Sequence, residues 1–533
     1  MCGATLIERL QGRFLGRDAA MGTMGDYKGR PSFPPATMGM MRAMTLSLSN
    51  KTGATAQEVR TQNFDAVVIG AGLGGLLSAA HLLQRGLRVV LVERLPHCGG
   101  RFTAKHFQGV QVSTGAVHMV PFGSSGVLAH MLRRLHVPHH LYDADVFGSF
   151  HVHGKQYRSR GLLGVYRFLG PRQFFWFLRL GYLMFLRPIP PEQQQLPFDL
   201  WLERHISVRR NPQLVAFFER ISRFALSLEL HQVSTAEVVR TTKNMFRFGA
   251  PAIVKGGCGA LTAELEAHVR AQGGKILLST EVEQIVQAEG QVTGVRVRDK
   301  SSGEVLLLNA PLVVSDIGPR ATTALLESRK VKQAEVLKQQ DEDELHEAVG
   351  LKVHVLSDVS LIPHRGIMYC LDTQRIAGIV QPTNSDPSLA PPGKHLLISH
   401  QVIQSNNIEE ERALALADLR MLFGEAFDRH CRVLTMGTYR GEWPVNRIVQ
   451  GEDVSPQMPV RGLYLVGDAV KPSGYLMVEG VAQSVNQFLD LLDELDQQQK
   501  KRESHLIKPH SRLYALQWLW KAPGNGNKKR RAD

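Results

Sequence analysis

The 533-residue chain has few cysteines, and none of them are closely paired. The five cysteines, Cys2, Cys98, Cys258, Cys370 and Cys431, include no Cys-x-x-Cys pair. This spacing argues against a zinc ribbon, a thioredoxin-type redox site and a disulfide framework. We therefore expect no metal site, and a reducing compartment is favoured over an oxidising one.

The first 62 residues lack the apolar core of a secretory signal. Two interpretations of this segment remain open. One is a transit peptide, although four acidic residues argue against it, and the other is a start codon placed too early, with Met44 as the real beginning. We expect residues 1–62 to form a disordered or targeting extension.

The positive charge is not spread over the fold. Of the formal net charge of +14, residues 1–62 contribute +4 and residues 500–533 contribute +8, which leaves about +2 for the rest. Within that remainder, residues 155–191 hold seven Lys or Arg and no acidic residue. Because neither a base-reading motif nor a finger spacing accompanies this charge, we expect no nucleic-acid partner.

One glycine-rich segment carries the clearest chemical signal. An apolar run over residues 64–69 is followed by Gly70, Gly72 and Gly75 at G-x-G-x-x-G spacing, with Gly74 inside the pattern. A helix is predicted over residues 76–85, ending before Gly86, and a second strand over residues 88–92. The pattern therefore predicts a strand, a tight turn, a helix and a second strand.

The spacing suits a bound dinucleotide. Gly70 permits the tight turn, Gly72 lets a pyrophosphate approach the backbone, and Gly75 lets the helix pack on the strand. The phosphates then meet the positive end of the helix. Glu93 ends the second strand, 18 residues beyond Gly75, where it can accept hydrogen bonds from a ribose. An ordinary glycine-rich turn would not account for this acid.

The residues after Glu93 distinguish FAD from NAD. Arg94 follows directly, and Gly99, Gly100 and Arg101 complete a Glu-x5-Gly-Gly-Arg pattern. At this point the chain resembles the superfamily of FAD-containing amine oxidases, protoporphyrinogen oxidases and phytoene desaturases. The resemblance implies FAD as cofactor, with this loop folded over the pyrophosphate and the arginine near it. A plain surface charge is the alternative for Arg101.

Two later segments resemble the same superfamily in the same order. The stretch RGLYLVGDA contains Gly467 and Asp468, and the resemblance implies that the aspartate binds the ribityl chain. The glycine turn KGGCGAL precedes Val282, for which the resemblance implies an adenine contact, although a plain core position is the alternative. The resemblance therefore covers about residues 63–492.

The resemblance implies an α/β fold. A three-layer, Rossmann-like FAD-binding domain with a mostly parallel sheet is expected from residues 63–130, 250–325 and 430–495. An α+β substrate domain from residues 131–249 and 326–429 would be interleaved with it, and residues 496–533 would form a basic tail. The later glycines Gly256, Gly257 and Gly259 lack the dinucleotide spacing. Electrons are therefore expected to pass through substrate, quinone or oxygen rather than a second dinucleotide.

An aromatic and basic helix is predicted over residues 171–187. At 100° per residue, Arg172, Arg179 and Arg187 fall within about 80° of one another, and most of the remaining surface is apolar. Because Arg179 is central, we expect the helix to lie in the plane of a membrane rather than to span it. A core helix lining a substrate tunnel is the alternative. The expected location is peripheral membrane, otherwise cytoplasmic or associated with plastid thylakoids.

The resemblance implies hydrogen removal or double-bond isomerisation on a large apolar substrate, as in the phytoene desaturase and carotenoid isomerase branch. Alternatives are a protoporphyrinogen-oxidase-like enzyme, an amine-oxidase-like enzyme, and a non-catalytic binder related to Rab escort and dissociation-inhibitor proteins. We assign no catalytic residue. His118 is expected to be structural, whereas Ser473 and Tyr475 are candidates for shaping the pocket.

Overall fold

The computed structural model describes residues 60–115, 117–159, 161–326, 346–449, 451 and 454–519. The chain divides into one compact unit up to Val485 and a second from Asn486 onward. Most of the predicted N-terminal extension, residues 1–59, lies outside the described residues.

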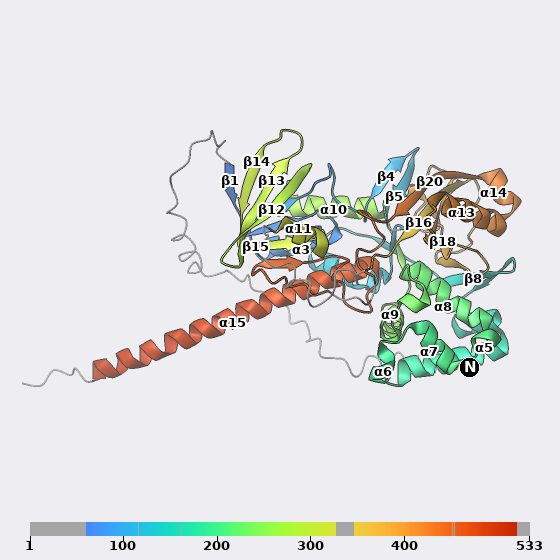
Figure 1. Cartoon of the computed structure of the whole chain (residues 1–533). Helices are drawn as coiled ribbons and strands as arrows, with labels where there is room; N and C mark the ends of the chain where they lie inside the picture. The colour runs from blue at the N-terminus through green and yellow to red at the C-terminus, as the bar shows by residue number, and fades with distance from the viewer. Residues whose placement is uncertain are drawn as a thin grey trace, which may run out of the picture. The chain divides into compact units, whose positions relative to one another are not determined.

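A five-stranded parallel sheet forms the centre of the first unit (Figure 1). Its strands are short buried apolar runs, typical of a sheet covered on both faces. In spatial order they are β11 (Lys275–Leu277), β3 (Val89–Val92), β2 (Ala66–Ile69), β15 (Leu312–Ser315) and β21 (Leu463–Leu465). They come from all three segments that the sequence assigned to the cofactor domain.

Helices and a second sheet complete three layers. Helices α3 (Leu73–Gln84) and α10 (Gly257–Ala271) pack on each other and against the parallel strands. A four-stranded sheet has the order β1-β14-β13-β12 and shares one apolar core with the parallel sheet. Its strands are β1 (Arg60–Asn63), β12 (Thr280–Ala288), β13 (Gln291–Asp299) and β14 (Val305–Asn309). This arrangement confirms the predicted fold class.

Part of the predicted N-terminal extension belongs to the fold. Residues 60–62 belong to β1, which runs parallel to β14 with Arg60 opposite Leu306. The ladder of β14 supplies backbone partners that a sequence window cannot show. The helix α3 also begins at Leu73 rather than residue 76, because Gly74 and Gly75 are part of its first turn.

A seven-stranded sheet forms the substrate part, in the order β20-β16-β19-β18-β17-β8-β9. The strands are β20 (Cys431–Tyr439), β16 (Gly350–Ser357), β19 (His395–Val402), β18 (Gly378–Val380), β17 (Ile367–Cys370), β8 (Gly148–Val152) and β9 (Lys155–Arg158). The sequence placed residues 430–439 in the cofactor domain. The structure instead pairs β20 with β16 along its whole length, so this strand belongs to the substrate sheet.

Smaller elements connect these sheets. The hairpin β4 (Ala104–Phe107) and β5 (Val110–Ser113) follows the cofactor loop. A three-stranded sheet joins β6 (Met119–Val120), β10 (Ala252–Val254) and β7 (Leu141–Asp143). Other helices of the described residues are α4 (Val127–Arg134), α11 (Pro319–Leu325) and α15 (Met477–Leu519). The last of these extends to Leu519, into the residues from 496 onward that the sequence assigned to a basic tail.

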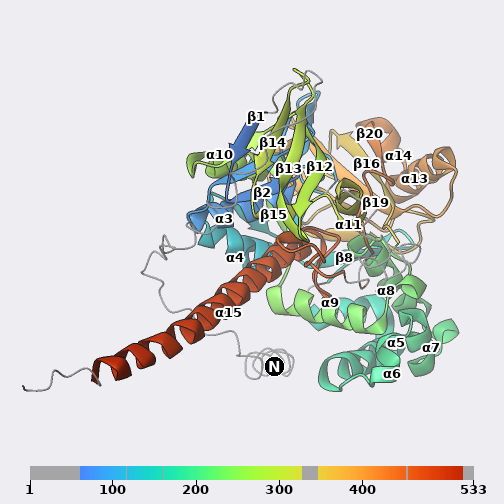
Figure 2. The same cartoon turned by 60° about the vertical axis from the view of Figure 1, so that its left-hand side comes forward.

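Helices α5 to α9 gather in one layer (Figure 2). They are α5 (Gly161–Leu186), α6 (Pro191–Gln194), α7 (Phe198–His205), α8 (Pro212–Ala225) and α9 (Thr235–Phe248). At Gly170 the backbone leaves the helical region, with φ 69° and ψ 171°, so the second segment of α5 starts at Pro171 as predicted. Among the described residues, no helix has the length and apolar character needed to cross a membrane.

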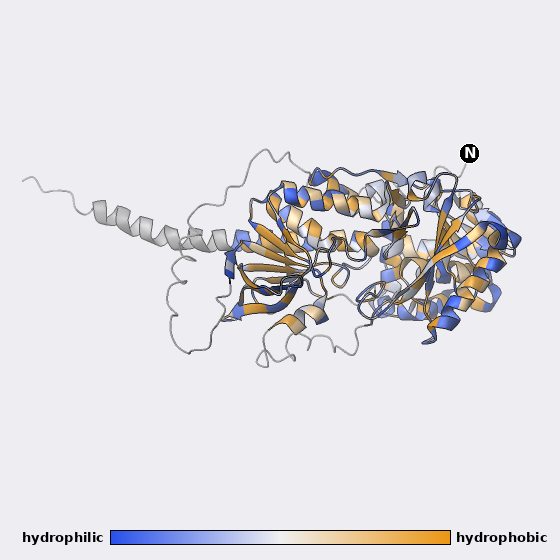
Figure 3. Cartoon of the chain, turned by 90° about the horizontal axis from the view of Figure 1, so that it is seen from above, coloured by the Kyte–Doolittle hydropathy of each residue, from blue (hydrophilic) through white to orange (hydrophobic). Residues whose placement is uncertain are grey.

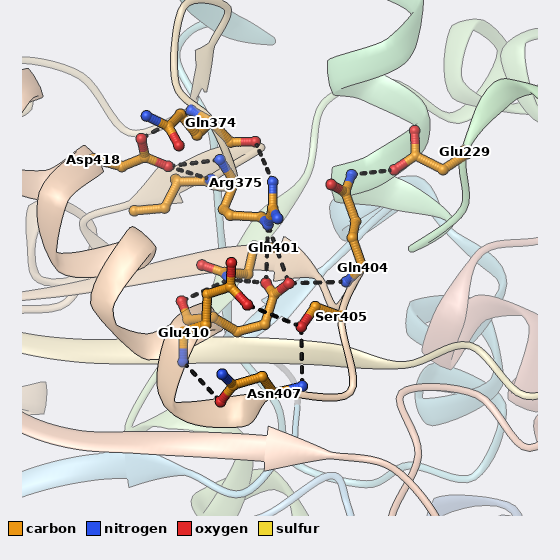
Figure 4. A network of polar contacts seen from close by, with 11 residues as sticks. Glu229, Gln374, Arg375, Gln401, Gln404, Ser405, Asn407, Glu410 and Asp418 are labelled. Atoms are coloured by element: carbon orange, nitrogen blue, oxygen red, sulfur yellow. Dashed lines mark hydrogen bonds and ion pairs between the residues drawn. The ribbon is translucent and has the colours of Figure 1, made fainter.

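Two buried carboxylates, Glu411 and Asp418, connect helix α13 (Ile408–Phe423) to the substrate sheet (Figure 4). Helix α14 (Glu425–His430) follows α13. Glu411 pairs with Arg375 at 3.1 Å and also accepts from Gln401. Asp418 accepts backbone N–H bonds from residues 374–376. Many strands are hydrophobic and appear orange in Figure 3, whereas this polar network ties α13 to the loop between β17 and β18. The network is therefore structural.

Candidate functional site

The glycine turn lies between β2 and α3. Gly70 has φ +92°, and a Cβ on Gly75 would overlap the carbonyl oxygen of Gly70. Gly72 is the N-cap of α3 and offers no side-chain cap to the first-turn N–H groups. Those donors and the helix dipole form an anion site of the kind that holds a pyrophosphate. The tight turn at Gly70 and the close packing at Gly75 are therefore as predicted, whereas the approach of a pyrophosphate at Gly72 stays a prediction.

Glu93 links the turn to the cavity. Its carboxylate accepts from the backbone N–H of Ala71 at 2.7 Å and from that of Leu95 at 2.9 Å. The side chain is nearly buried, yet it lines the same cavity as the glycines. Arg94 lies beside it, 3.3 Å from Glu442 and stacked over Trp443. One carboxylate thus fixes the turn and faces the space where a ribose would lie.

The Gly99-Gly100-Arg101 loop folds back onto the glycine turn. Gly99, at φ +104°, donates from its backbone N–H to the carbonyl oxygen of Ala71 at 2.7 Å. The Arg101 guanidinium donates to the carbonyl oxygen of Pro444 at 2.9 Å and pairs with Asp468. The arginine is only slightly exposed, so the surface-charge alternative for it is wrong.

Asp468 is held between two guanidinium groups. Besides Arg101, Arg447 contacts it with a side-chain nitrogen at 3.0 Å and its backbone N–H at 2.6 Å. Burial opposes ionisation, but the two arginines outweigh it and hold the pKa of Asp468 far below its usual range. The carboxylate is therefore ionised at neutral pH and has only acceptor oxygens to offer to sugar hydroxyls.

These segments surround one cavity of about 530 Å³. Ten of the twelve predicted cofactor residues line it: Gly70, Gly72, Gly74, Glu93, Arg94, Gly99, Gly100, Arg101, Val282 and Asp468. The other two, Gly75 and Gly467, lie beside it, where glycine makes room for neighbouring groups. The turn, the buried arginine and the acid at the strand end fit an FAD. That each of these residues touches the cofactor stays a prediction.

Several lining residues were not found from the sequence. Lys352 on β16 and Tyr439 on β20 reach the cavity from the substrate sheet, and Asp316 reaches it from the end of β15. Burial lowers the pKa of Lys352 to about 7, and the charge of Arg101 adds to this effect. Lys352 sits within an otherwise apolar strand, GLKVHVLS. A lysine in such an apolar run was the one sequence feature that could have marked Lys352 as a candidate site residue.

Other residues that the sequence singled out have structural roles. His118 is buried, contacts the carbonyl oxygen of Gln111 at 2.8 Å and accepts from the backbone N–H of Cys258 at 3.1 Å. Burial lowers its pKa to about 4, so it is neutral. Tyr475 packs against Phe122 in the core, and Ser473 is bonded to Glu237. Within the described part of the chain, no cluster of three or more His, Cys, Asp or Glu could hold a metal ion.

Fold and site together define a flavin-binding oxidoreductase. The family model described as flavin containing amine oxidoreductase matches residues 73–484, and the chain belongs to this family. Its cofactor is FAD. Family membership therefore favours an enzyme over the non-catalytic binder related to Rab escort proteins.

Three similar proteins extend the comparison. An uncharacterized protein of Methanocaldococcus jannaschii is 31% identical over 80% of this chain and 99% of its own length. An oxidoreductase from Methanosarcina mazei, solved by crystallography, has a TM-score of 0.73 and 33% identity, covering 80% of this chain and all of that one. A lycopene-forming phytoene desaturase of Pseudescherichia vulneris is 26% identical over 44% of this chain and 52% of its own.

Proposed function

We propose that this FAD-dependent oxidoreductase removes hydrogen from an apolar polyene or isoprenoid, or isomerises one of its double bonds. The observation that carries the proposal is the similarity to a phytoene desaturase, although the chain spans only about half of that relative's length. Cavity-lining Phe102, Trp443 and Val445 would suit an apolar substrate. Quinone or oxygen is the proposed electron acceptor.

The chain's own residues would bind and orient the reactants. FAD, when bound, supplies the hydride chemistry. Lys352 and Tyr439 belong to the substrate sheet and line the cofactor cavity. Because the pKa of Lys352 is lowered to about 7, its amine can take up or release a proton at neutral pH. We propose that the Lys352 amine takes up or releases the proton that is transferred when hydrogen is removed from the substrate.

An anaerobic titration tests the substrate class. The FAD-loaded protein would be mixed in turn with phytoene, a porphyrinogen and putrescine, and loss of the oxidised flavin band would be followed. Reduction by phytoene alone supports the proposal. Reduction by the porphyrinogen or by the amine would overturn it in favour of the protoporphyrinogen-oxidase-like or amine-oxidase-like function. For isomerisation, a cis-polyene incubated with reduced protein should yield the trans product by chromatography.

We also propose that the protein rests on a membrane surface through one face of α5. Phe175, Leu178, Tyr182 and Leu186 follow one another at helical spacing, and all are exposed, Phe175 by 59%. Phe246 of α9 is 69% exposed and packs its ring 5.1 Å from Phe185 of α5. The opposite side of the helix, with Leu180 and Met184, belongs to the core. Core packing therefore accounts for one side of the helix, and the membrane proposal concerns the other side.

Arginines border this exposed face. Arg172, Arg179 and Arg187 are exposed, and Arg179 stacks over Trp176 at 5.4 Å. An apolar face bordered by cations suits an anionic lipid surface, where each basic residue adds roughly 1 kcal/mol to the binding free energy.

Sedimentation with anionic vesicles tests the membrane proposal. Arg172, Arg179 and Arg187 changed together to Glu should release the protein, whereas Met421→Ser, at an exposed apolar position on α13, should not. Unchanged sedimentation of the triple variant would overturn it.

A further inference from the structure

Asp316 places a carboxylate directly on the glycine turn. The residue follows β15, and its backbone N–H donates to the carbonyl oxygen of Ile69 at 2.9 Å. Its Oδ2 accepts from the backbone N–H of Gly75, in the first turn of α3, at 3.1 Å. A Cβ on Gly74 would lie 2.7 Å from its Oδ1, and a Cβ on Gly72 or Gly467 would overlap the carboxylate.

This position is the one that the cofactor's diphosphate needs. The diphosphate is expected to approach Gly72 and take N–H donors from the first turn of α3. Asp316 already approaches Gly72 and already takes one such donor. The carboxylate and the diphosphate are both anions, and they require the same donors in the same narrow space.

The surrounding charges do not resolve this conflict. Arg447, the backbone N–H of Gly75 and Arg101 favour the ionised form of Asp316, whereas the charge of Asp468 opposes it. Asp468 already engages both arginines. An ionised Asp316 therefore leaves the four side chains without net charge before the doubly negative diphosphate enters. Burial is the largest influence and raises the pKa of Asp316 to about 7.

We propose that cofactor binding is coupled to a proton on Asp316, and that the ionised carboxylate competes with the FAD diphosphate for the N-terminus of α3. The protonated carboxyl is neutral, and it can donate a hydrogen bond to a phosphate oxygen. FAD should therefore bind best when the pH is below about 7. At higher pH, binding should be accompanied by uptake of a proton from solvent onto the Asp316 carboxylate. This inference concerns how the cofactor is acquired and is independent of the proposed substrate.

Titration of the apoprotein with FAD tests the coupling. Quenching of flavin fluorescence would give Kd between pH 6 and pH 9 for the wild type, for Asp316→Asn and for Asp358→Asn, a control at an exposed carboxyl. For the wild type and the control, Kd should rise with pH, approaching tenfold per pH unit above about pH 7. For Asp316→Asn, Kd should stay low and constant. A constant wild-type Kd, or a variant that is weaker at every pH, would overturn the inference.

Calorimetry of the wild type provides a test that needs no variant. FAD binding at pH 8 would be measured in two buffers with different heats of ionisation. The difference between the two heats should correspond to uptake of nearly one proton. Binding without proton uptake would overturn the inference even if Asp316→Asn did not fold.

Discussion

The side-chain nitrogen of Lys352 lies 4.6 Å from the centre of the Tyr439 ring, across the neighbouring strands β16 and β20. The ring face attracts the charged amine, whereas burial disfavours that charge. Burial dominates and lowers the pKa of Lys352 to about 7. The cavity therefore contains an amine that changes charge near neutral pH.

Replacing Lys352 by Met should change how stability depends on pH. Between about pH 7 and pH 10.5 the unfolded lysine holds a proton that the folded one has lost, so wild-type stability should rise with pH across this window. The Met variant should be more stable than the wild type at pH 7, by on the order of 3 kcal/mol, and this advantage should shrink by pH 10. Urea unfolding of the apoproteins at several pH values measures these free energies of unfolding. Lys394→Met, at an exposed lysine, should leave the slope unchanged, and parallel curves for all three proteins would contradict the assignment.

Gly72→Ala should weaken cofactor binding. Its Cβ would overlap the Asp316 carboxylate and block the backbone surface that a pyrophosphate approaches. We expect FAD affinity to fall at least about tenfold, which corresponds to about 1.4 kcal/mol. Fluorescence quenching measures the affinity. Gly181→Ala is the matched control, because nothing lies within 4 Å of the added Cβ, and it should bind FAD normally.

Asp468→Asn should destabilise the cofactor site. The change leaves Arg101 and Arg447 close together without the carboxylate that pairs with both. Removing one partner of a buried ion pair typically costs about 3–5 kcal/mol. Since the pKa of Asp468 is lowered in the folded protein, its ionised side chain stabilises the fold above about pH 4. This stabilisation is lost as the pH falls further. Urea unfolding at neutral and acidic pH should show the difference between wild type and variant shrinking in acid. Equal stability at neutral pH would argue against the ion pair.

Glu237→Ala should loosen the loop before α15. The Glu237 carboxylate accepts from the backbone N–H of Gly474 at 2.8 Å and from the hydroxyl of Ser473, which ties α9 to that loop. Its loss leaves a buried N–H group without this acceptor, at a cost of about 1–3 kcal/mol. Thermal unfolding measures the loss. Ser473→Ala should cost less, and Glu264→Ala, at an exposed site on α10, should cost almost nothing. A Glu237 variant as stable as the control would show that the tie contributes little.

The cofactor side of the site was largely predictable, because its signals are local. Backbone geometry requires glycine at Gly70 and Gly75, and Glu93 follows at the distance that one helix and one strand demand. The cavity-lining residues from the substrate sheet were not predictable in this way. Lys352 and Tyr439 meet only because β16 pairs with β20, and that register is set by contacts between distant segments.

The sequence by itself determined the α/β class, the cofactor turn and the amphipathic character of the α5 helix, with its arginines on one face. Each of these depends on residues close together in the chain. Only the tertiary structure decided that β20 joins the substrate sheet, that Arg101 and Arg447 share Asp468, and that Asp316 lies on the glycine turn. Long-range pairing and burial produce these relationships. The charge state of a buried group depends on neighbours that the order of residues does not reveal.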